Sequence, residues 1–205
     1  MKPFRRVQRG PVNDSTNDTQ AYAAAMTRTE RTVLGQVVGD VEALLAPDTP
    51  VASDPLWLST EDVLPPDDPA VARLLPDASR DDPEVANEFR RLTQEELRTT
   101  KVAGLRALSL RLSATPPGFD PHDVVVLMDE APRTAAALTD VRLVLAERLG
   151  LRTDDDAEAL AVELSDPRNA NGPRRGLGDL YQALTWWQET LIHAMTESLP
   201  DDPAA

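Results

Sequence analysis

The chain of 205 residues contains no cysteine and only two histidines. The missing cysteine excludes disulfides, thiolate zinc sites, iron–sulfur clusters, cysteine nucleophiles and thiol-based redox switches. Long apolar runs are missing too. None reaches the roughly 18–20 residues that a membrane helix needs, and the first residues lack the apolar core of a signal peptide. The sequence therefore predicts a soluble, cytoplasmic protein that makes no membrane contact.

Basic residues are scarce beside acidic ones: 21 Lys and Arg stand against 35 Asp and Glu, a formal net charge of −14. Because an acidic surface repels phosphate backbones, we expect contact with DNA to be weak or indirect. Only residues 1–12 and 90–111 form basic islands. In the second island, the candidate contacts for DNA or an acidic partner are Arg90, Arg91, Arg98 and Lys101. Solvated helix faces are the alternative interpretation of both islands.

With 41% hydrophobic residues, the chain is globular, and its length suits a single domain over residues 1–205. We predict a mainly α fold, a compact bundle of four to five main helices. A small β-hairpin or three-stranded sheet near the N-terminus completes it. The remaining parts are a basic N-terminal hairpin (1–26), an acidic strap with eight prolines (47–83) and a disordered tail (200–205).

Capping patterns and apolar periodicity place the individual elements. Thr27 with Glu30, and Thr93 with Glu96, each match a capping box, which marks a helix start. The expected strands are Phe4–Val7, Ala21–Met26 and Val124–Leu127. The expected helices are one from Thr27 to Leu45, short turns over Leu56–Leu58 and Ala70–Leu75, and then Pro83–Leu92, Thr93–Ala114, Glu130–Leu149, Asp154–Leu164 and Leu177–Leu199. A loop over Ser165–Gly176 carries the Arg174-Arg175 pair.

No set of residues suggests catalysis, a metal or a cofactor. The best metal candidates, Glu189, His193 and Glu197, share one face at i, i+4 and i+8, but a solvated helix face explains them better. Trp187 falls on the apolar stripe of the last helix. No nucleophile is accompanied by a base and an oxyanion donor, so we expect a non-enzymatic protein.

Several stretches, in order along nearly the whole chain, resemble one protein family. The stretches are Phe4-Arg5-Arg6, Asp68–Asp77, Glu88–Arg98 followed by Lys101, Leu138–Gly150 and Tyr181–Leu191. This family, formerly classed as a domain of unknown function, is that of the actinobacterial oxidative-stress transcription regulators (AosR). The residues that carry the resemblance most clearly are Asp140, Arg142, Trp187, Gln188 and Glu189.

The resemblance implies a non-enzymatic regulator that acts with an alternative sigma factor or RNA polymerase, with homo-oligomer formation open. Its implied alternative is a non-catalytic adaptor or assembly protein linked to Clp proteolysis or cysteine biosynthesis. Redox sensing in the family is attributed to a cysteine pair, which this chain lacks. We therefore expect protein binding without thiol switching. Oxidation of Met26, Met128 or Met195 is the alternative sensor, although core methionines are favoured.

Overall fold

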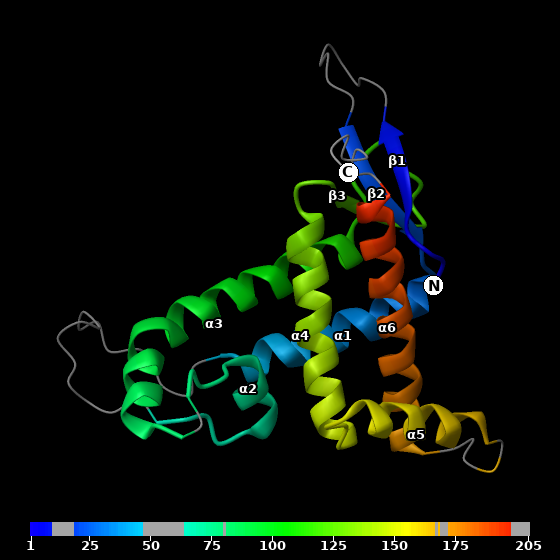
Figure 1. Cartoon of the computed structure of the whole chain (residues 1–205). Helices are drawn as coiled ribbons and strands as arrows, with labels where there is room; N and C mark the ends of the chain where they lie inside the picture. Colours follow the sequence, from blue (N-terminus) through cyan, green and yellow to red (C-terminus); the bar gives the residue numbers. More distant parts are fainter. Residues whose placement is uncertain (10–18, 47–63, 80, 167, 169–171, 198–205) are drawn as a thin grey trace, which may run out of the picture.

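The structure, a computed structural model, describes residues 1–9, 19–46, 64–79, 81–166, 168 and 172–197. Within these ranges it is mainly α-helical, with a small antiparallel sheet near the N-terminus, as the sequence predicts (Figure 1). The elements are β1 (Arg5–Arg9), β2 (Thr19–Ala25), α1 (Arg28–Leu44), α2 (Pro69–Leu74), α3 (Pro83–Ser113), β3 (Asp123–Leu127), α4 (Ala131–Leu149), α5 (Asp154–Ser165) and α6 (Pro173–Thr196). The predicted turn over Leu56–Leu58 and the predicted tail over 200–205 lie outside the described residues.

The sheet has β2 at its centre, paired antiparallel with β1 on one side and β3 on the other. Alternate side chains of β2 point to opposite faces. Tyr22 and Ala24 join the main core, whereas Ala21 and Ala23 form a small separate cluster with Val125 of β3. Because both faces are covered, β2 is buried along most of its length.

Helix α4 forms the middle of the bundle. It runs beside α6 in Figure 1, while α1 and α3 cross behind the pair and α5 lies at the far end from the sheet. Its buried residues lie on more than one side, because α2, α3 and α6 all pack against it. None of the helices in the described ranges combines the length and apolarity that a membrane span requires.

Two of the predicted helix boundaries rest on local chemistry that the structure confirms. At the start of α1, the Thr27 hydroxyl accepts from the backbone N–H of Glu30, and the Glu30 carboxylate accepts in return from the backbone N–H of Thr27. At the end of α4, Gly150 adopts the left-handed conformation with φ of 75°. A residue without Cβ reaches that conformation at least cost, so the helix stops there.

The predicted helix start at Thr93 is wrong, because α3 is one continuous helix of 31 residues. The true cap is Asp82, whose carboxylate accepts from the backbone N–H groups of Glu84 and Val85. The Thr93 hydroxyl instead donates to the carbonyl of Phe89, four residues earlier, at 2.8 Å. Bonds of this kind often bend helices, and Figure 1 shows α3 bent in its N-terminal part.

The predicted loop over Ser165–Gly176 is also too long. Helix α6 begins at Pro173, so Arg174 and Arg175 lie in its first turn. Arg174 donates to the carbonyl of Leu149 at 2.9 Å and pairs with Glu163 of α5. Proline fits the first turn of a helix, since its missing N–H has no acceptor there.

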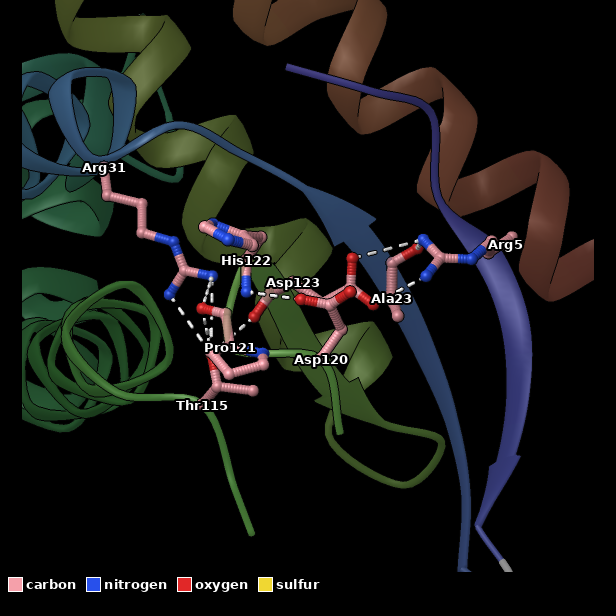
Figure 2. Close-up of polar contacts among 8 residues, drawn as sticks. All are labelled: Arg5, Ala23, Arg31, Thr115, Asp120, Pro121, His122 and Asp123. Atoms are coloured by element: carbon pink, nitrogen blue, oxygen red, sulfur yellow. Dashed lines mark hydrogen bonds and ion pairs between the residues drawn. The ribbon is translucent and has the colours of Figure 1, made fainter. Parts of the chain in front are cut away.

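The N-terminal residues contact both α6 and the sheet. The Phe4 ring stacks on Trp187 of α6, with 4.7 Å between the ring centroids. Arg5 forms a two-pronged ion pair with Asp123 at the start of β3, with a shortest distance of 2.6 Å (Figure 2). The hairpin is therefore held by α6 and by the sheet together.

Candidate functional site

The first two predicted contact residues, Arg90 and Arg91, pair with acids of the chain itself. Arg90 forms an ion pair with Asp77, and only 11% of its side chain is exposed. Arg91 is bound by Glu88, one turn earlier on α3, at 2.8 Å. The hydrogen bond to Glu88 raises the pKa of Arg91 above its ordinary value. Neither guanidinium is a free charge on the surface.

The other two candidates connect α3 to its neighbours. Arg98 donates to the carbonyl of Leu45, at the end of α1, at 2.8 Å. Lys101 donates to Asp140 of α4 at 2.6 Å. Both cationic side chains are mostly buried, 16% and 18% exposed. The structure therefore gives these cations a role in helix packing, and their contact with DNA or a partner stays a prediction.

Asp140, one of the residues that carry the resemblance, forms an ion pair with Lys101. Burial raises the pKa of Asp140, and the hydrogen bond from Lys101 opposes that rise without cancelling it. A charged carboxylate in this position is thus costly to desolvate and depends on its partner.

Arg142, Gln188 and Trp187 form the α4–α6 contact. Arg142 donates to the Thr185 hydroxyl at 2.9 Å and to the side-chain oxygen of Gln188 at 2.6 Å. Gln188 in turn donates to the carbonyl of Ala135. Trp187 is fully buried, as predicted. These resemblance-carrying residues hold two helices together, whereas Glu189 is exposed.

The three residues considered as metal ligands, Glu189, His193 and Glu197, do not form a metal site. His193 pairs with Glu197 at 3.2 Å, with both side chains more than two-thirds exposed. Across the described ranges, no three His, Cys, Asp or Glu side chains are grouped so that they could hold a metal ion.

A surface that we did not predict lies on the N-terminal part of α3, which extends farthest from the sheet and α6 in Figure 1. Val85, Phe89 and Leu92 share one face there, at i, i+4 and i+7. They are 51%, 39% and 61% exposed. We call these three residues the α3 stripe. Their spacing is visible in the sequence, but it equally fits a stripe that packs into the core, so only the structure shows it as exposed.

Acidic residues surround the α3 stripe. Residues 83–96 contain four Glu and two Arg, and both Arg already have carboxylate partners. Glu84 and Glu96 are exposed. The stripe is thus an apolar patch within an acidic surface.

Comparison with known proteins gives a family but no activity. The model of the family described as "Domain of unknown function (DUF2017)" matches residues 1–195. No curated protein and no solved structure matches the chain. Since the match covers residues 1–195 of 205, the chain belongs to the DUF2017 family.

Proposed function

We propose that the protein is a non-enzymatic, transcription-associated regulator that works through contacts with another protein. The resemblance to the oxidative-stress regulators (AosR) suggests the partner, an alternative sigma factor or RNA polymerase. The chain has no thiol to oxidise, so this contact operates without cysteine-based switching.

The observation that carries this proposal is the α3 stripe. Exposed aromatic and aliphatic side chains on one helix face are typical anchors of a protein interface. The stripe lies on the part of α3 that projects from the bundle, where a partner can approach it (Figure 1). The acidic border favours a partner whose own surface is basic, as a surface that contacts nucleic acid is.

Contact with DNA is indirect in this proposal. The predicted DNA contacts on α3 are neutralised by carboxylates or held by a backbone carbonyl, so they offer phosphate little net attraction. With a net charge of −14, the chain reaches promoters by binding a protein that binds DNA.

The test is mass spectrometry of the proteins that co-purify with a tagged copy from crosslinked native cells. We expect RNA polymerase and a sigma factor with the wild type, and a loss of about tenfold in their recovery with Val85→Ser/Leu92→Ser. Truncating two interface anchors costs at least about 1.4 kcal/mol, which is tenfold in affinity. Phe89 is kept because it also lines a small cavity together with Leu75.

The matched control is Leu110→Ser/Val162→Ser, which removes two aliphatic side chains on α3 and α5 that lie away from the stripe and are more exposed than Val85 and Leu92. It should recover polymerase and sigma factor as the wild type does. Recovery of Clp components or cysteine-synthesis enzymes instead would overturn the regulator proposal in favour of the adaptor. Equal losses in both double variants would show that the α3 stripe is not the contact.

A further inference from the structure

A groove at the N-terminal end of α1 contains two arginines that have no carboxylate partner among the described residues. It has a volume of about 890 Å³ and lies between α1, the C-terminal part of α3 and the turn before β3. Arg28 and Arg31 enter it from the first turn of α1, and His122 enters it from the turn. Among the described residues that line the groove there is no Asp or Glu, although the chain as a whole is strongly acidic.

Neutral groups hold Arg31 in place (Figure 2). Both terminal nitrogens of its guanidinium donate to the Thr115 hydroxyl at 3.3 Å, and one of them also donates to the carbonyl of Pro121. Thr115 is itself fixed, since its hydroxyl donates to the carbonyl of Asp123 at 2.6 Å. The guanidinium is thus oriented, no carboxylate of the described residues pairs with it, and some of its five N–H donors remain available.

Arg28 and His122 add two more groups to the same groove. The Arg28 guanidinium is exposed and has no hydrogen-bond or ion-pair partner within the described residues. The His122 ring lies on the same side as Arg31 in Figure 2 and can donate a hydrogen bond in either protonation state. Of the nearby acids, Glu30 is bound by Thr27 and by the N-terminal amine, and Asp120 accepts from the backbone N–H of His122.

The rest of the groove suits an organic molecule. Ser109 and Gln36 offer a hydroxyl and an amide, while Met26 and Leu112 supply apolar surface. Gly35 also lines the groove, and a Cβ placed there would meet nothing within 4 Å. The volume falls within the roughly 300–1,000 Å³ of small-molecule sites and is far larger than a bare phosphate ion requires.

The geometry points to this groove as a binding site for a small organic phosphate. Arg28, Arg31 and His122 contact the phosphate, and the organic part lies over Gly35. Arginine forks match phosphate oxygens, and an acid-free lining on an acidic protein attracts anions only locally. The overall charge disfavours a long polyanion, so the ligand is a small molecule and not nucleic acid.

Calorimetric titration of the purified full chain at low ionic strength tests the site. The probes are AMP and ribose 5-phosphate, with adenosine and ribose as their phosphate-free counterparts. We expect the phosphorylated probes to bind and their counterparts not to bind. Arg28→Gln, Arg31→Gln and Gly35→Leu should each weaken binding about tenfold, the first two through a lost charge-assisted bond and the third by filling the groove.

Two variants serve as matched controls. Arg133→Gln removes another exposed arginine without a carboxylate partner in the described ranges, but from α4 outside the groove. Gly39→Leu adds the same side chain one turn further along α1, where a Cβ also meets nothing within 4 Å and the residue lines a different groove. Both should bind the phosphorylated probes as the wild type does.

Any of three results would overturn the inference. The first is that the wild type binds neither phosphorylated probe, and the second is that the control variants lose as much affinity as the groove variants. In the third, a short DNA duplex binds more tightly than AMP and depends on Arg28, which would make the groove a nucleic-acid contact. Since the Arg28 guanidinium has no hydrogen bond or ion pair within the described residues, its variant remains informative if Arg31→Gln destabilises the chain. The outcome is independent of the α3 stripe.

Discussion

Asp68 shows how much one side chain can do at a helix start. Its carboxylate accepts from the backbone N–H of Ala70 at 2.8 Å, which caps α2, and from Arg148 of α4 at 2.6 Å. The hydrogen bond from Arg148, and then that from Ala70, lower the pKa of Asp68 below its ordinary value of 3.8. The same carboxylate thus closes a helix and attaches that helix to the centre of the bundle.

We predict that Asp68→Asn lowers the free energy of unfolding by about 0.5 kcal/mol, the value of an exposed ion pair, because asparagine keeps the cap and loses the charge. Asp68→Ala should cost about 1 kcal/mol more, since the cap is lost as well. Urea unfolding followed by circular dichroism measures both. If the two variants were equally stable, the capping bond would contribute nothing.

The loss of unfolding free energy caused by Asp68→Asn should depend on pH. A carboxyl whose pKa is lowered in the folded state stabilises the fold above its unfolded pKa, and this contribution is lost as the pH falls through the lowered value. The difference between Asp68→Asn and the wild type should therefore persist at neutral pH and shrink below the ordinary pKa of 3.8. Unfolding curves at several pH values would check this, and a difference that grows in acid would contradict it.

At the scale of elements, the same pattern, Thr followed three residues later by Glu, occurs at the start of α1 and within α3, but it caps a helix only in α1. Thr27 with Glu30 forms a capping box, whereas Thr93 with Glu96 lies inside a continuous helix. We predict that Thr27→Ala costs about 1 kcal/mol of unfolding free energy, as the loss of an N-cap does. Thr93→Ala should be neutral or slightly stabilising, because alanine is the better helix former.

Thermal unfolding of the two alanine variants side by side checks this prediction, with each serving as control for the other. A larger loss at Thr93 than at Thr27 would mean that α3 is interrupted at Thr93.

The sequence predicts that a helix is present more reliably than it predicts the residues at which the helix begins and ends. The apolar period locates α1, α4 and α6, and a run of branched residues locates β3. The residue at which a helix begins depends on competition between nearby capping residues. At Asp82 a proline follows the capping acid, and the helix that starts there is long enough to pass through Thr93. A local pattern does not show which of two caps is used, because the choice is made by packing over the whole helix.

At the scale of the whole molecule, the Lys101–Asp140 pair joins α3 to α4 across 39 positions of sequence. We predict that Lys101→Met lowers the free energy of unfolding by about 3 kcal/mol at neutral pH, because it leaves a buried carboxylate without its partner. Replacing both partners, Lys101→Met/Asp140→Leu, should be close to neutral or stabilising. Chemical unfolding of the single and double variants measures both.

The deficit of Lys101→Met should shrink as the pH falls. Burial raises the pKa of Asp140, so the folded state favours the protonated carboxyl. A group with a raised pKa contributes stability below its unfolded pKa and loses it as the pH rises through the folded value. A single variant whose deficit is the same in acid and at neutral pH, or a double variant as unstable as the single, would contradict this account.

The candidate binding surfaces could be predicted from the sequence less well than the fold. Basic residues on α3 looked like contacts because a sequence does not show that Asp77 and Asp140 reach them. Arg31 and His122, conversely, were unremarkable until the fold placed them in one groove. The charges available to a ligand or partner are those that do not form an ion pair within the fold. Ion pairing between residues distant in sequence is a property of the tertiary structure.

The central position of β2 has a consequence for how the chain is made. Ala25 pairs with Asp123, about a hundred residues later, so the β1–β2 hairpin leaves the ribosome long before its third strand exists. At a synthesis rate of about 5–20 residues per second, the wait is about 5–20 s. During that time β2 has one edge without its partner strand, the feature that invites pairing with another nascent chain.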